Sequence, residues 1–267
     1  MIPGALIFII GILLFYLCIK AYRKSRKVSF PDVPPMQQTL EAVLEKRVDF
    51  YKELKEQDQS DFAERVHQFL ERIKITPVKG AGVTDEDRVL IGAAAVIPLF
   101  RYRNWFYNNL NEVLVYPDAF SKDYELEKGD RSISGMVGNG PLHRTMILSL
   151  PYLRSGFSRN SGSNTAIHEF AHLLDQSDGA TDGVPELILQ DQNIKPWVQY
   201  MHRYIQDIRK GKMNDINPYG ATNEAEFFAV MTEYFFQKPE KLKEQHPELY
   251  MILDEAFGNK EKPDVEQ

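Results

Sequence analysis

Apolar residues recur with the period of an α-helix through most of the chain beyond residue 38. One apolar stripe begins at Leu40, Val43 and Leu44 and extends to Leu54, which predicts a first helix. A second stripe predicts a helix over residues 61–73. Further helices are expected over residues 85–97, 167–174, 185–192, 197–210, 222–236 and 239–257.

Strand patterns are short and few. Residues 113–116 and 146–148 are β-branched and aliphatic runs bounded by polar residues, and each predicts a strand. The polar segment 117–141 lies between them, and its length is typical of a lid or binding loop, although an ordinary surface loop is equally consistent. The pattern as a whole predicts a helix-rich α+β fold with a small sheet.

The N-terminus has a different pattern. Residues 2–19 form an uncharged apolar run, which as a helix would span about 27 Å, close to a bilayer core of about 30 Å. Basic residues cluster after this run and not before it, unlike a cleavable signal peptide. We therefore expect a single transmembrane helix in the cell membrane, with the rest of the chain in the cytoplasm by the positive-inside rule.

This patterning divides the 267 residues into four segments. Residues 1–20 are expected to be a transmembrane anchor, and residues 21–38 a basic juxtamembrane segment and proline-containing linker. Residues 39–258 are expected to form the folded domain, and residues 259–267 a flexible tail.

Composition excludes several classes of function. The net charge of −6 argues against nucleic-acid binding, which requires a basic face. Cys18 is the only cysteine, so the chain has neither an intramolecular disulfide framework nor a cysteine-ligated zinc cluster.

The strongest chemical signal is an H-E-x-x-H pattern formed by His168, Glu169 and His172. Residues four apart lie on one face of a helix, so both imidazoles can bind one zinc ion. Glu169 is rotated by about 100° from His168, from where it can reach a water on the open side of the metal and act as general base. A five-residue pattern can arise by chance, but its apolar neighbours favour a buried metal site over a solvated surface helix.

Catalytic zinc sites usually have three protein ligands. Asp178 lies six residues after His172, where some metallopeptidases place the third ligand, but the glycine that such proteins need midway is replaced here by Asp175. Asp175 and Asp178 are more plausible as groups that orient an imidazole or end the helix.

The alternative third ligand is Glu226, on the apolar face of the helix predicted over residues 222–236. A carboxylate on such a face needs a partner, which a zinc ion or a basic residue would supply. Glu233 follows two turns later on the same face, whereas Glu224 is expected to face solvent near the helix start.

With these residues in place, the sequence resembles the Mlc titration factor A family of zinc metallopeptidases. The resemblance covers about residues 49–240, and it includes five segments: residues 85–91, 112–117, 168–175, 182–183 and 219–236. It implies a zincin-type fold with one zinc ion on His168, His172 and Glu226, and with Glu169 as the base. It also implies that Tyr219 stabilises the oxyanion and that Glu233 supports the ligands. The known family pattern describes soluble proteins, so the apolar N-terminus departs from it.

These observations favour a membrane-anchored zinc peptidase that hydrolyses peptides in the cytoplasm, and the resemblance points to aminopeptidase-like activity. The alternative is a regulatory binding protein that sequesters a transcriptional repressor or another cytoplasmic partner, since the family's namesake binds such a repressor. A third possibility is a structural membrane protein in which the motif is incidental. Glu169 favours the enzyme, because a binding scaffold has no need of a base.

Overall fold

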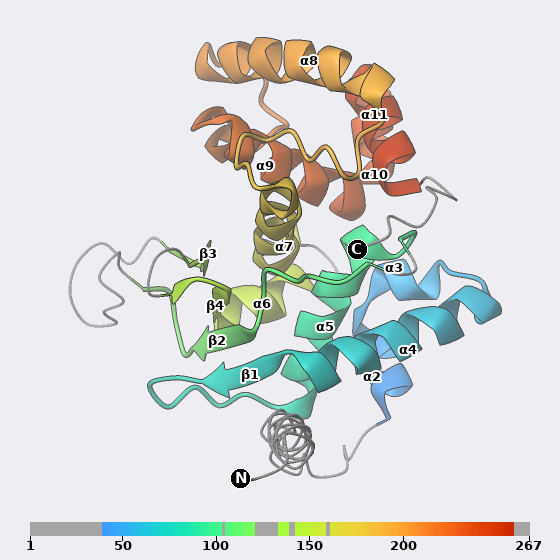
Figure 1. The fold of residues 1–267 in the computed structure, drawn as a ribbon, viewed down its shortest axis with the longest axis vertical. Helices are drawn as coiled ribbons and strands as arrows, with labels where there is room; N and C mark the ends of the chain where they lie inside the picture. Colours follow the sequence, from blue (N-terminus) through green and yellow to red (C-terminus); the bar gives the residue numbers. More distant parts are fainter. Residues whose placement is uncertain (1–38, 103–104, 121–132, 139–141, 159–160, 259–267) are drawn as a thin grey trace, which may run out of the picture. The chain divides into compact units, whose positions relative to one another are not determined.

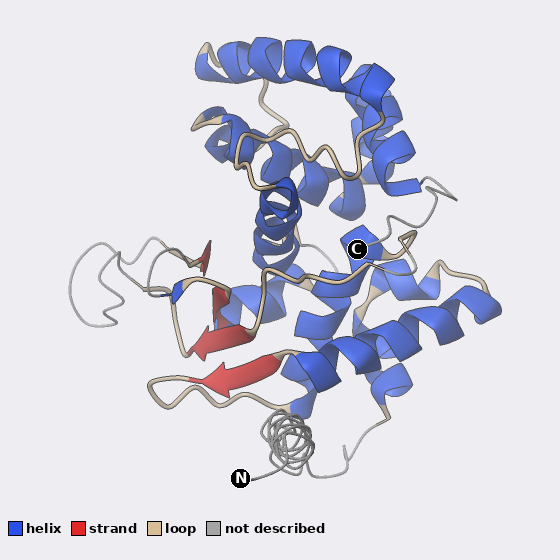
Figure 2. Cartoon of the chain, viewed as in Figure 1, coloured by secondary structure: helices blue, strands red, loops and turns tan. Residues whose placement is uncertain are grey.

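The computed structural model describes residues 39–102, 105–120, 133–138, 142–158 and 161–258. These residues form a helix-rich α+β fold with one small sheet, as the sequence predicts (Figures 1 and 2). The predicted transmembrane anchor, linker and C-terminal tail lie outside the described residues. Within the described ranges, no helix combines the length and apolar character that a membrane span requires.

The sheet contains four strands in the order β1-β2-β4-β3. Strands β1 (Lys74–Pro77), β2 (Glu112–Tyr116) and β4 (Thr145–Ser149) are parallel, with Val113 of β2 opposite both Ile75 and Met146. Strand β3 (Gly135–Val137) pairs antiparallel with β4 and forms an edge of the sheet. Strand β4 is almost wholly buried, as expected for a central strand covered on both faces.

The N-terminal helices pack against one another. They are α2 (Leu40–Arg47), α3 (Asp49–Lys52), α4 (Glu56–Arg72) and α5 (Asp85–Leu99), and α4 also contacts β1. Helices α4 and α5 pack closely because α5 carries the small residues 92–95: a Cβ atom on Gly92 would lie 2.9 Å from Cγ1 of Val66. The small side chains of α5 therefore let the two helices approach closely.

Helix α7 (Thr165–Asp175) occupies the centre of the fold. It contacts β3 and β4 on the sheet side, α5 and α6 (Leu150–Gly156) beside it, and α9 (Glu224–Gln237) on the other side (Figure 1). The remaining helical elements complete the C-terminal half: η2 (Gln176–Asp178), α8 (Asp191–Arg209), η3 (Pro218–Ala221), α10 (Pro239–Gln245) and α11 (Pro247–Gly258).

Several predicted boundaries are wrong. The first helix breaks at Val48, whose backbone is extended, and the last breaks at His246 into α10 and α11. Residues 185–190 form a turn rather than a helix, in which the N–H groups of Ile188 and Leu189 both bond to the carbonyl of Pro185, and residues 191 and 192 already belong to α8. Strand β3 lies within the segment predicted as one polar loop, and β1 and α6 were not predicted.

Candidate metal centre

Helix α7 presents the two histidines of the motif from a buried position. Asn164 caps the helix: its Oδ1 accepts the N–H of Ile167 at 3.2 Å. The apolar residues Ile167 and Phe170 are fully buried, which fixes the rotation of the helix about its axis. His168 and His172 therefore emerge together toward α9, with ring centroids 4.9 Å apart.

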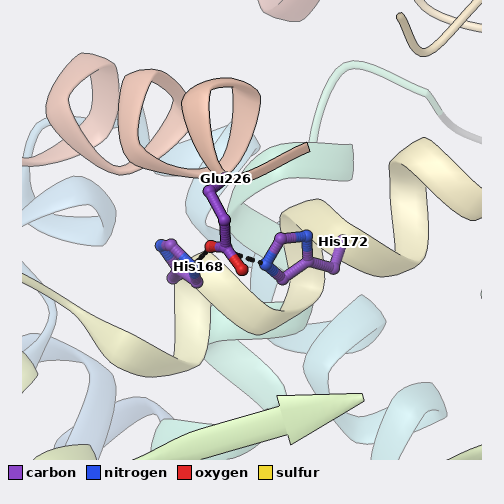
Figure 3. Close-up of side chains that lie close together, drawn as sticks. All are labelled: His168, His172 and Glu226. Atoms are coloured by element: carbon purple, nitrogen blue, oxygen red, sulfur yellow. Dashed lines mark hydrogen bonds and ion pairs between the residues drawn. The ribbon is translucent and has the colours of Figure 1, made fainter. Parts of the chain in front are cut away.

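Helix α9 brings Glu226 to these histidines. Asn223 is the N-cap of α9, and its Oδ1 accepts the N–H of Glu226 at 2.9 Å. This cap places Glu226 in the first turn of α9, directly over α7 (Figure 3). His168 and Glu226 are 58 positions apart in the sequence, and the contact between α7 and α9 brings them together.

The three side chains form a group that could hold a metal ion. Oε2 of Glu226 lies 3.0 Å from Nε2 of His168 and 3.3 Å from Nε2 of His172 (Figure 3). One potential ligand atom from each residue lies within 4.8 Å of the other two. Two imidazole nitrogens and a carboxylate oxygen are a donor set found in catalytic metal sites.

The electrostatics of the group reflect this crowding of charge. Burial alone would lower the pKa of His168, but the carboxylates of Glu226 and Glu233 outweigh it and raise the pKa to about 10. Burial likewise opposes ionisation of Glu226, yet its hydrogen bonds to the two histidines lower its pKa to about 2. His168 and Glu226 thus form a buried imidazolium–carboxylate pair, and metal binding at these atoms would release the proton of the imidazole.

Glu169 is 5% exposed and lines the same cavity as the three residues. Burial is the largest influence on its carboxyl group and, despite the nearby His168 and His172, keeps its pKa above the usual range. A carboxylate with a raised pKa is a stronger base, as a group that accepts a proton in catalysis requires.

Tyr219 lies at the rim of the group, on the short helix η3, where Oδ1 of Asn217 accepts its N–H at 3.0 Å. Its hydroxyl donates to Oε1 of Glu226 at 3.2 Å, and its ring is 53% exposed. Burial, followed by the charge of Glu226, raises the pKa of Tyr219 to about 12, so the hydroxyl keeps its proton at neutral pH.

The alternative ligand Asp178 is not part of this group. Asp178 is exposed, and its carboxylate accepts the N–H groups of Ala180 and Glu186 at 3.0 Å each, which makes it a turn residue. Asp175 is buried, and its Oδ2 accepts the N–H of Gly183 at 3.0 Å. Among the described residues neither aspartate bonds to an imidazole. Asp175 is the last residue of α7 and Asp178 the last of η2, so the structure shows the alternative role expected for them, at the end of the helix.

Glu233 contacts His168, as its place two turns after Glu226 suggests. Its Oε2 lies 3.4 Å from Nδ1 of His168, and its Oε1 accepts the N–H of Asn164 at 2.8 Å. Glu224 is exposed in the first turn of α9, as predicted, with Nε2 of His202 at 3.8 Å.

A cavity of about 880 Å³ opens beside these residues. Strand β3 forms one wall, and α7, η3 and the start of α9 form the others. Its described lining includes four glutamates and two histidines but no lysine or arginine. This lining is therefore acidic, which suits the binding of a cation.

One residue of the site escaped sequence reasoning. A Cβ atom on Gly135 would lie 2.7 Å from Cγ and Oε1 of Glu169 and 2.7 Å from Cγ2 of Thr165. Strand β3 can approach α7 this closely only because position 135 has no side chain. Nothing near Gly135 in the sequence signals this contact, because its partner lies 34 positions away in another element.

The chain is similar in sequence to several known proteins. An uncharacterized protein of Synechocystis is 32% identical over 235 residues, covering 84% of each chain. Mlc titration factor A of Pectobacterium atrosepticum is 30% identical over 219 residues, covering 76% of this chain and 80% of its own. Mlc titration factor A of Escherichia fergusonii is 26% identical over 250 residues, covering 88% and 89%.

The domain is a helix-rich α+β fold with a two-histidine, one-glutamate group that could hold a metal ion, as in a metallopeptidase. Residues 19–258 match the family described as glucose-regulated metallo-peptidase M90. The chain belongs to this family, and the family resemblance expected from the sequence is confirmed.

Proposed function

We propose that this protein is a zinc-dependent peptidase. The observation that carries the proposal is the convergence of His168, His172 and Glu226 within 4.8 Å in a cavity that Glu169 also lines. Ligand atoms around one tetrahedral zinc ion lie roughly 3.3 Å apart, given bonds of about 2.0–2.1 Å. The two distances from Glu226 to the imidazoles, 3.0 and 3.3 Å, fit that ion.

The side chains have distinct roles in this proposal. Zinc, when bound, supplies a Lewis acid that lowers the pKa of water to about 7. The Glu169 carboxylate takes a proton from the attacking water and gives it to the leaving amine. The Tyr219 hydroxyl turns from Glu226 and donates a hydrogen bond to the oxygen that becomes negative as the tetrahedral carbon forms.

Strand β3 supports a peptide as substrate. The N–H of Ser149 bonds to the carbonyl of Ser134, and the N–H of Gly138 bonds to the carbonyl of Thr145. In an antiparallel pair only alternate residues face the partner, so the backbone groups of Gly135 and Val137 face away from β4. Both residues line the cavity, where an extended peptide can add to this edge by main-chain hydrogen bonds.

The charge of the cavity favours cleavage near a free N-terminus. The described lining residues include no lysine or arginine that could pair with a substrate's C-terminal carboxylate. The exposed Glu224 carboxylate, in contrast, can pair with an α-ammonium group. These features support the aminopeptidase-like activity that the sequence suggested.

Two further expectations are part of the proposal. We propose that residues 1–20 anchor the enzyme in the cell membrane with the domain in the cytoplasm. A reporter that is active only in the cytoplasm tests this: fused after Gln267, it should be active.

A second function is favoured by the relatives named Mlc titration factor A, namely binding of a regulatory protein such as a repressor. Substitution of Glu169 separates the two, since it leaves a partner-binding surface intact.

The test of the enzyme is peptide cleavage by the full-length chain. Glu169→Gln is expected to keep the zinc and to lower kcat by about 10²–10⁴-fold, the usual contribution of general acid–base catalysis. Glu71→Gln is the matched control, because its side chain is 67% exposed on α4, and it is expected to leave kcat unchanged. Undiminished cleavage by Glu169→Gln would reject the proposed mechanism.

A further inference from the structure

A second cavity, of about 210 Å³, lies away from the metal centre and shares no lining residue with the first. It is bounded by α4, by α5 and by the loop that leads to β2. Phe69, Trp105, Phe106 and Tyr107 contribute aromatic rings to its wall. A ligand with an apolar body therefore has a surface to contact.

The charged groups of this cavity are all of one sign. Arg65, Arg72 and Arg144 line it, and no aspartate or glutamate does so in the part of the chain that the structure describes. This is unusual in a chain with a net charge of −6. Buried or half-buried cations are normally paired, so the missing anion is a property to explain.

Arg65 already has a structural role. Its guanidinium donates to the carbonyls of Leu99 and Phe100 at the end of α5, at 2.7 and 2.5 Å. It contributes positive charge to the cavity wall while its own hydrogen bonds hold the loop. The two other arginines are available to a ligand.

Arg144 has an unsatisfied donor in a strained position. Its Nε atom is buried without a hydrogen-bond partner, although a second guanidinium nitrogen bonds to the carbonyl of Asn108. Its φ angle is 62°, in the left-handed region that favours glycine. An arginine here thus combines backbone strain with an unpaired buried N–H, and both features are typical of functional positions.

Arg72 is exposed and marks where the cavity opens. Its guanidinium carbon lies 3.7 Å from the centroid of the Phe106 ring. Among the described residues neither Arg72 nor Arg144 forms an ion pair with a carboxylate. A guanidinium stacked on a ring keeps its edge free to bind a carboxylate through two N–H groups.

We propose that this cavity binds a small organic carboxylate with an apolar ring or branched body. Arg144 and Arg72 bind the carboxylate, and the aromatic wall binds the body. A cavity of about 150 Å³ accommodates benzene, so 210 Å³ provides room for one ring with its carboxylate. The site depends on neither the metal nor the proposed peptidase activity.

The test is calorimetric titration of the full-length chain with benzoate, with benzyl alcohol as an uncharged ligand of similar size, and with inorganic phosphate as an anion without an apolar body. We expect benzoate to bind at least about tenfold more tightly than either, the effect of one charge-assisted hydrogen bond. Benzoate that binds no better than benzyl alcohol, or phosphate that binds more tightly than benzoate, overturns the proposal.

Two variants locate the binding. Arg72 lies on the surface, so Arg72→Gln should preserve the fold, and we expect it to weaken the binding of benzoate about tenfold. Arg144→Lys keeps the charge but loses the planar guanidinium, which can donate two hydrogen bonds to one carboxylate. We expect it to weaken the binding of benzoate as well. Arg101→Gln is the matched control, since Arg101 also lies over an aromatic ring, at 5.6 Å from Phe100, but does not line the cavity. If Arg72→Gln and Arg144→Lys bind benzoate as tightly as Arg101→Gln does, benzoate binds elsewhere, for example at the metal residues, and the proposal is wrong.

Discussion

Both ring nitrogens of His168 face a glutamate carboxylate. Its Nε2 faces Glu226 at 3.0 Å, and its Nδ1 faces Glu233 at 3.4 Å. Glu233 is itself fixed by the N–H of Asn164 at the start of α7. The N-terminus of α7 and the middle of α9 thus jointly set the orientation of the imidazole, which a metal ligand requires.

Loss of Glu233 is expected to weaken zinc binding without removing a ligand. Glu233→Ala should reduce zinc affinity about 10–100-fold, as for other groups that orient a ligating histidine. Glu233→Gln should lie between this variant and the wild type, because the amide oxygen can still accept the Asn164 N–H. Competition with a chelator measures the affinity. Wild-type affinity in Glu233→Ala would show that the 3.4 Å contact has no orienting role.

At the residue scale, much of the site could be predicted. The spacing of His168, Glu169 and His172 encodes their common helix face, and a glutamate on an apolar face pointed to Glu226. Gly135 could not be predicted, because its importance comes from a contact between elements and not from a local pattern. The place of Tyr219 came from the family resemblance rather than from chemistry alone.

At the scale of elements, the site depends on how closely β3 packs on α7. The side chain of Glu169 lies against the backbone of Gly135, so the strand both shapes the cavity and restricts the base. A methyl group at position 135 would have to move either the strand or the glutamate.

Gly135→Ala is therefore expected to lower kcat at least about tenfold while zinc remains bound, because a displacement of about 1 Å in a catalytic group can cost 10²-fold. Gly82→Ala is the control, since a Cβ atom there meets nothing within 4 Å. Steady-state kinetics with zinc analysis provide the comparison. Equal kcat values for the two variants would mean that β3 can shift to make room for the methyl group and does not restrict Glu169.

Long helices with clear stripes could be predicted, and short elements could not. Helices α7 and α9 were expected near their observed positions, whereas β1 and β3 contain four and three residues, too few for a periodic pattern. The helix predicted over residues 185–192 is wrong because Ile188 and Leu189 lie in a turn and are buried there. Their apolar character reflects packing and not helical structure.

At the scale of the whole molecule, one buried carboxylate joins separate parts of the fold. Asp87 is 2% exposed and completes a capping box with Thr84 at the start of α5. It also accepts from Nε of Arg154 on α6 at 2.7 Å. Burial opposes its ionisation, but the bonds from Arg154 and Thr84 outweigh burial and lower its pKa.

Because the folded-state pKa of Asp87 is lowered, its contribution to stability is present above the unfolded value near 3.8 and is lost as the pH falls through the folded value. Arg154→Gln should reduce the free energy of unfolding by about 1–3 kcal/mol at pH 7, a range that allows for the 45% exposure of Arg154. The difference from wild type should shrink as the pH falls below about 4 in denaturant titrations.

Lys52→Gln is the control for this experiment, because it removes a surface ion pair with Asp49 and should change stability by less than about 0.5 kcal/mol. A stability difference for Arg154→Gln that stays constant from neutral to acidic pH would show that Arg154 does not act through the Asp87 carboxylate.

The account as a whole depends on one zinc ion held by two helices that are distant in the sequence. X-ray absorption at the zinc edge of the full-length chain tests this most directly. We predict two imidazole nitrogens at about 2.0–2.1 Å, with the remaining ligands oxygen at about 2.0–2.2 Å. A spectrum with fewer than two imidazoles, or a chain that retains no zinc, would contradict the assignment of His168, His172 and Glu226 as ligands.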